Sequence, residues 1–219
     1  MGEGTEAILF DLDDTIGDWA TAVDRTVLSA GLSEVDLARI GAALREFVCV
    51  RREARIVDRH HWRLFHEDME WESIVEDASV AKILRAAFRT AERPGPYTDA
   101  DVLAELGLDY RIGLLTNNPY GEAALAKYGL RGHFEAVVMM DEPFLKPHRR
   151  GFEEACAALD LPPGRVAMVG DSLANDVEGA LSAGLVPIWV DRFHDGYVAD
   201  AGVHRIESLR ELPELLRSI

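Results

Sequence analysis

The sequence predicts an α/β protein with a doubly wound parallel sheet that is interrupted early by an inserted all-helical domain. After residue 93, short and continuously apolar segments alternate with helical segments, as expected for parallel strands that helices cover on both faces. Between residues 17 and 92 the pattern changes, and apolar residues recur three and four positions apart. We therefore expect a core domain of residues 1–16 and 93–219 and a helical domain of residues 17–92.

The elements of the expected core alternate along the chain. The segment AILF after Glu6 is the first strand, because it is short, apolar and followed directly by carboxylates. Pro94-Gly95-Pro96 marks the return from the helical insertion to the core. We expect strands at 6–10, 111–115, 136–139, 166–169 and 186–190, helices at 99–106, 122–128, 150–159 and 174–183, and a last strand edge and helix within 206–216.

The insertion is expected to consist of amphipathic helices. One begins at Ser33, whose side chain can cap the first turn, and its apolar residues continue to Val48. Two further helical patterns cover residues 60–69 and 77–88. The insertion therefore reads as a separate helical module rather than as part of the sheet.

The composition limits the partners of the protein. Its 219 residues carry a formal charge of −16 with a pI of about 4.8, which repels nucleic acid and anionic membrane surfaces. No stretch approaches the about 18–20 apolar residues that span a bilayer, and the first residues do not resemble a signal peptide. Cys49 and Cys156 lack CxxC spacing, which argues against a disulfide or zinc site. We expect a cytoplasmic protein with neither nucleic acid nor a membrane as partner; the sequence does not indicate its oligomeric state.

Four predicted strands lead directly into residues that can take part in chemistry. In open α/β sheets, ligands bind beyond the carboxyl ends of the strands. Taken singly, each segment is compatible with a turn, a helix cap or a surface lysine, but their occurrence in order at four strand ends points to a common site. The segments are Asp11-Leu12-Asp13-Asp14-Thr15, Thr116-Asn117-Asn118, Lys146-Pro147 and Gly170-Asp171-Ser172, with Asp176 shortly after the last.

If these strand ends converge, their charges require compensation. Four aspartates and one lysine leave three net negative charges in a small space, which is strongly unfavourable. A divalent cation would remove most of this charge, and protonation of one carboxyl would remove the rest. Oxygen ligands favour magnesium (Mg²⁺), and a carboxyl with a raised pKa suits general acid catalysis. The charged residues concerned are Asp11, Asp13, Lys146, Asp171 and Asp176.

Together, FDLDDT, LLTNN, LKP and VGDSLANDVEGA closely resemble the four motifs of the haloacid dehalogenase superfamily of phosphohydrolases. The resemblance covers about residues 5–16 and 95–219, and the insertion resembles the helical C1-type cap of that superfamily. It implies a Rossmann-like catalytic core with a cap domain. It also implies magnesium-dependent hydrolysis of a small phosphorylated metabolite through an aspartyl-phosphate. Ile16 stands where leucine is usual, and the approach to Lys146 is less typical.

The resemblance implies a role for each residue that handles the phosphoryl group. Asp11 matches the nucleophile, and Asp13 matches the general acid and base. Thr116 matches the hydroxyl that binds the transferring group, with Asn117 beside it, and Lys146 matches the lysine that stabilises its charge. These five residues are the candidate catalytic and phosphate-binding set.

The resemblance also implies a set of magnesium ligands. They would be a carboxylate oxygen of Asp11, the backbone carbonyl of Asp13 and Asp171, while Asp176 would support the metal site. Asp14 would point elsewhere along the extended segment and is assigned no catalytic role.

A helical cap could exclude water from the site and select the substrate. In the insertion, Arg51, Arg55 and Arg59 recur every four residues and would form one basic stripe on a helix. The stripe is interpreted either as a solvated face paired with nearby acids or as contacts to an anionic substrate group.

Several other activities are compatible with the same scaffold. A phosphosugar mutase would use the same aspartyl-phosphate but keep the phosphate. A 2-haloacid dehalogenase is less favoured, because that branch does not need the second aspartate, which is present here as Asp13. A phosphonate-cleaving enzyme would need a cap lysine, for which Lys82 is a weak candidate. A non-catalytic binding protein on the same scaffold would normally lack one of the motif residues. For a phosphatase, the sequence leaves nucleoside monophosphates, phosphosugars and phosphoglycolate-like acids open as substrates.

Overall fold

The computed structural model describes residues 4–38, 75, 77–90, 94–192, 194 and 201–219. The chain forms two compact units. Unit 1 consists of Met1–Asp18 and Gly95–Ile219 and contains the sheet. Unit 2 consists of Trp19–Pro94, and its described secondary structure is helical.

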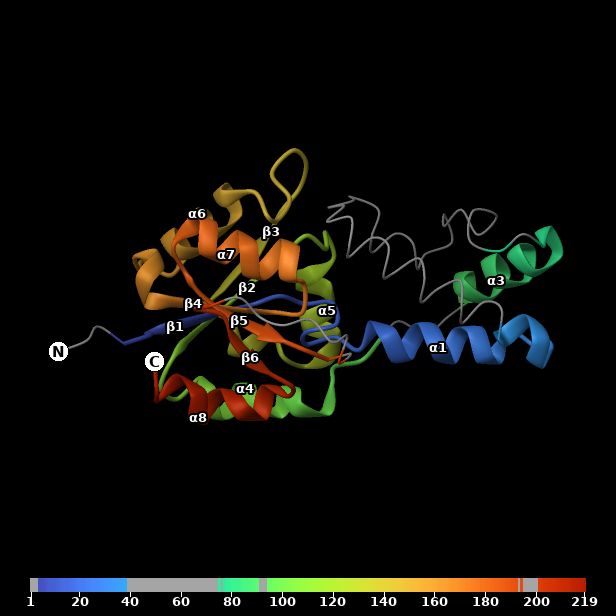
Figure 1. Cartoon of the computed structure of the whole chain (residues 1–219), viewed down its shortest axis with the longest axis horizontal. Coiled ribbons are helices and arrows are strands. Elements are labelled where there is room, and N and C mark those ends of the chain that lie inside the picture. Colours follow the sequence, from blue (N-terminus) through green and yellow to red (C-terminus); the bar gives the residue numbers. More distant parts are fainter. Residues whose placement is uncertain (1–3, 39–74, 76, 91–93, 193, 195–200) are drawn as a thin grey trace. The chain divides into compact units, whose positions relative to one another are not determined.

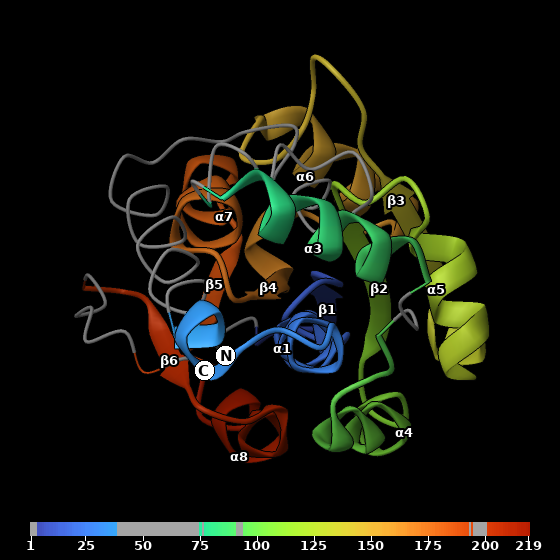
Figure 2. The same ribbon diagram turned by 90° about the vertical axis from the view of Figure 1, so that its right-hand side faces the viewer.

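Unit 1 is built on a six-stranded sheet in which every neighbouring pair of strands is parallel. The strands are β1 (Ala7–Phe10), β2 (Arg111–Thr116), β3 (Ala136–Met139), β4 (Val166–Gly170), β5 (Val186–Val190) and β6 (His204–Ile206). Figure 1 labels these strands. Their order across the sheet is β3-β2-β1-β4-β5-β6, so β1 lies between β2 and β4, as Figure 2 shows. The predicted doubly wound parallel sheet is confirmed.

Helices cover both faces of the sheet. Successive side chains of a strand point to opposite faces, so each apolar strand contributes to an apolar cluster on either side. On β1, Ile8 and Phe10 belong to one apolar cluster and Ala7 and Leu9 to another, and all four are fully buried. Figure 2 shows the two helical layers on opposite sides of the strands. The first cluster is closed by α4 (Leu103–Leu106), α5 (Gly121–Tyr128) and α8 (Leu212–Leu216), and the second by α6 (Arg149–Ala158) and α7 (Glu178–Ala183).

Two predicted helices begin with turns that are not α-helical. The predicted helix at 99–106 starts as a 3₁₀ helix, Thr98–Val102, which continues into α4. The predicted helix at 174–183 starts as a π-helical turn, Leu173–Val177, which continues into α7. This wider turn arises because the carbonyl of Ser172 accepts a hydrogen bond from the N–H of Val177 (3.2 Å), five residues further on. Such turns often occur at functional sites.

The described part of unit 2 contains two long helices, α1 (Trp19–Ser29) and α3 (Ala78–Thr90), which pack against each other. Residues 34–38 are also helical, and Oγ of Ser33 accepts a hydrogen bond from the N–H of Asp36 (3.1 Å), which confirms the predicted cap. The helix predicted at 77–88 is found as α3. The predicted helix at 60–69 and the basic stripe of Arg51, Arg55 and Arg59 lie outside the described residues.

In the part of the chain that the structure describes, no helix combines the length and the apolar character needed to cross a membrane.

Candidate active site

The ends of β1, β2 and β4 bring predicted site residues to one edge of the sheet. Asp11 directly follows β1, and its N–H donates to the carbonyl of Val169 on β4 (2.9 Å). Two positions beyond Val169 the chain reaches Asp171. On the other side of β1, β2 ends at Thr116, two positions beyond the partner of Phe10. Because each position adds only about 3.3 Å along a parallel strand, these residues lie at the same edge.

A buried lysine joins two of the aspartates. The Nζ atom of Lys146 donates hydrogen bonds to Oδ1 of Asp11 and to Oδ1 of Asp176, both at 2.6 Å. The side chain of Lys146 is 2% exposed and that of Asp176 is 1% exposed, so these charges are almost completely removed from water. Removing one member of such a set leaves the others buried without compensation. The three residues therefore act as one electrostatic unit.

Burial and neighbouring charges act in opposite directions on this unit. Burial alone would lower the pKa of Lys146, but Asp11 and Asp176 together raise that pKa above its ordinary value, so the lysine stays protonated. Burial raises the pKa of Asp176 to about 6 despite the opposing effect of Lys146, and Asp11 adds to the rise. Asp176 is thus a carboxyl with a raised pKa inside the cluster, and the resemblance assigns it to support of the metal site.

Three carboxylates converge at this place. One oxygen each from Asp11, Asp171 and Asp176 lies within 4.8 Å of the other two. Ligand oxygens lie about 2.1 Å from a magnesium ion, so two of them are at most about 4.2 Å apart, and a small adjustment lets the three share one ion. When all three are ionised, the cluster and Lys146 carry two net negative charges, which one divalent cation would neutralise. These residues fit a hard divalent cation such as Mg²⁺.

Gly170, the last residue of β4, makes room for one of these carboxylates. A Cβ atom at this position would overlap the carboxylate of Asp176. That carboxylate is held against the strand by the N–H of Ser172, which donates to Oδ2 (3.0 Å), while Oδ1 accepts from Lys146. The glycine and the π-helical turn together place a buried carboxylate at the end of β4.

Asp13 is held by a partner of its own. Asn118 donates from Nδ2 to both carboxylate oxygens of Asp13, at 3.2 and 3.0 Å. Asn118 is fixed in turn, because its Oδ1 accepts from the N–H of Tyr120 (2.9 Å) and its own N–H donates to Oγ1 of Thr116 (3.1 Å). The role of Asn118 could not be predicted from the sequence, since its contact with Asp13 spans 105 positions and leaves no local signal.

The side chain of Asn117 ties the loop after β2 to the backbone of Lys146. Its Oδ1 accepts from the N–H of Lys146 (2.7 Å), and its Nδ2 donates to the carbonyl of the same residue (3.2 Å). Thr116 precedes it and is 1% exposed. The structure therefore brings Thr116, Asn117 and Lys146 together, and their binding of phosphate stays a prediction.

Asp171 is positioned through its backbone. Its N–H donates to Oγ1 of Thr15 (3.1 Å), and its carbonyl accepts from Nε1 of Trp189 on β5 (2.9 Å). Thr15 is fully buried and belongs to the loop that starts at Asp11. This threonine links the ends of β1 and β4, a function that its position in DLDDT does not reveal by itself.

Known proteins resemble this chain over most of its length. The model of the haloacid dehalogenase-like hydrolase family matches residues 5–184. Human N-acylneuraminate-9-phosphatase is 27% identical over 97% of this chain and 94% of its own length. Phosphoglycolate phosphatase from Chromobacterium violaceum is 29% identical over 97% of both chains. The crystal structure of a HAD phosphatase from Thermococcus onnurineus has a TM-score of 0.63 at 25% identity, covering 97% of this chain and 98% of that one. The chain belongs to the haloacid dehalogenase-like hydrolase family.

Proposed function

We propose that the protein is a magnesium-dependent phosphatase that hydrolyses a small-molecule phosphomonoester through an aspartyl-phosphate on Asp11. The observation that carries this function is the buried cluster in which Asp11 bonds Lys146 and converges with Asp171 and Asp176. Two relatives that match almost the whole chain, the human and the Chromobacterium proteins, are phosphatases, which supports the same reaction type here.

Asp11 is the nucleophile in this mechanism. Its carboxylate attacks phosphorus, the bond to the leaving oxygen breaks, and an acyl phosphate forms on the protein. The approach of one anion to another needs nearby positive charge, and the ammonium of Lys146 already lies 2.6 Å from Oδ1 of Asp11. Thr116 and Asn117 would receive the phosphoryl oxygens through hydroxyl and backbone N–H groups.

Asp13 is the general acid and base. It gives a proton to the leaving oxygen in the first step and takes one from the water that attacks phosphorus in the second. The products are an alcohol and inorganic phosphate, and Asp11 is regenerated. Because Asn118 donates to both oxygens of Asp13, the rotation of this carboxyl is restricted and one position can serve both steps.

The metal would be held by carboxylate oxygens of Asp11 and Asp171 and by the backbone carbonyl of Asp13. Asp176 would support this site through its bonds to Lys146 and Ser172. When bound, Mg²⁺ supplies positive charge that reduces the repulsion between the nucleophile and the phosphate.

In this function residues 1–16 and 93–219 form the catalytic core, and residues 17–92 form a cap that selects the substrate. The two units of the structure meet along the chain at Asp18 and Gly95. Contact of Arg51, Arg55 and Arg59 with an anionic part of the substrate stays a prediction about the cap.

The test is release of inorganic phosphate from a panel of phosphomonoesters, with MgCl₂ or with EDTA. The panel contains N-acylneuraminate 9-phosphate and phosphoglycolate, on which the relatives are named to act, together with nucleoside monophosphates and sugar phosphates. We expect release from at least one compound, and only with MgCl₂. Isomerisation of a sugar phosphate without release would identify a mutase instead.

A pair of variants assigns the nucleophile. Asp11→Asn removes the attacking carboxylate and should abolish turnover while the chain remains folded. Asp14→Asn makes the same change three positions further on, where the carboxylate accepts a bond from the hydroxyl of Tyr97 (3.4 Å), and should keep most of the activity. Activity retained in Asp11→Asn would remove that residue from the role.

A further inference from the structure

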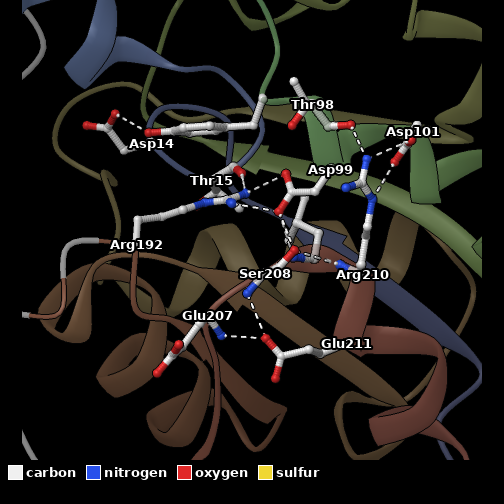
Figure 3. A network of polar contacts seen from close by, with 12 residues as sticks. Asp14, Thr15, Thr98, Asp99, Asp101, Arg192, Glu207, Ser208, Arg210 and Glu211 are labelled. Carbon is white, nitrogen blue, oxygen red and sulfur yellow. Dashed lines mark hydrogen bonds and ion pairs between the residues drawn. The ribbon is translucent and has the colours of Figure 1, made fainter.

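Arg192 holds a position that the reaction described above does not use. It lies two positions beyond β5, and its side chain is 9% exposed. Its guanidinium group donates from Nη1 and Nη2 to the two carboxylate oxygens of Asp99, at 2.7 and 3.1 Å. It also donates from Nη2 to the backbone carbonyl of Thr15 (2.6 Å), as Figure 3 shows. Arg192 therefore joins the segment after β5 to the loop that starts at Asp11.

Asp99 is the fixed end of this contact. Its Oδ2 also accepts from the hydroxyl of Ser208 (2.9 Å; Figure 3). The N–H of Leu209 donates to the same oxygen, also at 2.9 Å. Burial would raise the pKa of Asp99, but the hydrogen bond from Arg192 and the bond from Leu209 outweigh burial and lower it. The carboxylate is therefore ionised and held from several sides, so it can anchor the guanidinium group.

Thr15 connects Arg192 to the candidate active site. Its carbonyl accepts from Arg192, and its hydroxyl accepts from the N–H of Asp171 (3.1 Å). One buried residue thus connects the guanidinium group with the aspartate that follows β4. The same loop carries Asp11 four positions earlier. A shift of the Thr15 backbone would alter the separation between Asp11 and Asp171, whose carboxylates would share one cation in the proposed function.

The arrangement is not explained by stability alone. A buried ion pair is often no more stabilising than apolar residues of the same size. In the part of the chain that the structure describes, the Nε atom of Arg192 is buried without a hydrogen-bond partner, which is unfavourable. The guanidinium group also packs 4.1 Å above the ring of Tyr97, so its plane is fixed. Only arginine offers a planar fork that can bond a carboxylate and a carbonyl at once.

We propose that Arg192 is a positioning residue, which holds the Thr15 carbonyl so that Asp11 and Asp171 keep the separation at which they bind a divalent cation. This role rests on the proposed function, because it concerns the same metal site. If Arg192 were purely structural, it would only tie the 3₁₀ helix Thr98–Val102 to the end of β5. Its replacement would then lower stability without changing the affinity for the cation.

Arg192→Met tests the role, with titration calorimetry of MgCl₂ alone as the main measurement. Residues behind the ligands of a metal typically change its affinity by about 10- to 100-fold, so we expect the dissociation constant for Mg²⁺ to rise about tenfold. At saturating MgCl₂, kcat should fall while KM for the phosphomonoester changes little, since Arg192 acts through Thr15. Arg192→Lys keeps the charge but not the fork, and should show a smaller loss of the same kind.

Two matched variants separate positioning from stability. Arg210→Met removes another arginine that bridges a backbone carbonyl and a carboxylate, those of Thr98 and Asp101, both at 2.9 Å (Figure 3). Ser208→Ala removes a bond to Asp99 but leaves the contact between Arg192 and Thr15 in place. Both variants should bind Mg²⁺ as the wild type does, and Ser208→Ala should nevertheless unfold at a lower temperature.

The outcomes distinguish the two levels of the inference. A wild-type protein that neither binds Mg²⁺ nor releases phosphate would overturn the proposed function itself. A wild type that does both, together with an unchanged Mg²⁺ dissociation constant in Arg192→Met, would overturn the positioning role. If Arg192→Met does not fold, Arg192→Lys decides in the same way, and an unchanged dissociation constant again refutes the role.

Discussion

Replacement of Lys146 by methionine would leave two buried carboxylates without their shared cation. The ammonium bonds Asp11 and Asp176 at 2.6 Å each, and its side chain is 2% exposed. Methionine has a similar length and fills most of the space, so the main effect is electrostatic. Breaking a buried charge pair costs about 3–5 kcal/mol. For a chain of this size, 1 kcal/mol corresponds to roughly 2–4 °C in Tm, so we expect a fall of about 6–20 °C.

The measurement is thermal unfolding by circular dichroism in buffer with EDTA, so that no metal compensates the carboxylates. Lys127→Met is the matched control, because the chain has only three lysines and Lys127 is exposed on α5. An exposed substitution of this kind changes stability by about 0.5 kcal/mol or less. Addition of MgCl₂ to Lys146→Met should recover part of the lost stability, because the cation supplies positive charge in place of the lost ammonium.

Asp176→Asn gives the electrostatic reasoning its sharpest test, because the sign of its effect depends on Lys146. In the wild type this substitution removes a partner of the buried ammonium and should lower Tm. In the Lys146→Met background it removes an uncompensated carboxylate and should raise Tm. The same direction of change in both backgrounds would refute the reasoning, as would a Tm of Lys146→Met equal to that of Lys127→Met.

Three further expectations follow from the contacts around the site. Gly170→Ala adds a Cβ atom that overlaps the Asp176 carboxylate, and calorimetry should show weaker Mg²⁺ binding together with a lower Tm. Asn118→Ala frees the Asp13 carboxyl and should lower kcat by up to about 100-fold in steady-state assays, with a loss of about 1 kcal/mol in stability because the N–H of Tyr120 loses its bond to Asn118. Because the folded pKa of Asp99 is depressed, its ionisation stabilises the fold above the unfolded pKa of about 3.9, and this contribution is lost as pH falls through the folded value. Urea unfolding should therefore show a difference between wild type and Asp99→Asn that is largest near pH 7 and shrinks below about pH 4.

The strands of the core could be predicted because their signal is local. The segment at 7–10 has no polar side chain, and such a short run is buried only as a strand with both faces covered. The ends differ by a residue in places, since β2 continues to Thr116, whose β-branched side chain suits a strand. The site segments come directly after predicted strands. The candidate cluster could therefore be placed at the carboxyl ends of these strands from the sequence.

The contacts that fix the cluster could not be predicted, because they join distant positions. Arg192 is one of 20 arginines, and its partners Asp99 and Thr15 lie 93 and 177 positions away. Asp99, in the 3₁₀ helix Thr98–Val102, also bonds the N–H of Leu209, which lies 110 positions further on. Periodicity locates a helix but does not record which long-range bonds its side chains make.

The strand order explains why residues from both halves of the chain meet at Asp11. After β1 the chain forms β2 and β3 on one side, then returns to form β4, β5 and β6 on the other, so the order reverses at β1. Ligands bind in open α/β sheets at such a reversal, because the loops on either side diverge there.

Unit 2 is inserted into the chain between β1 and β2. The segments of unit 1 that precede and follow the insertion lie side by side. The N–H of Asp18 donates to the carbonyl of Gly95 (2.9 Å), and Gly17 pairs with Pro96. An insertion whose ends are adjacent can change in length or sequence without moving β1 or β2. We therefore expect substrate selection to depend on Trp19–Pro94, while the chemistry depends on unit 1. Cap substitutions should then alter KM for one phosphomonoester relative to another and leave Mg²⁺ binding as it is.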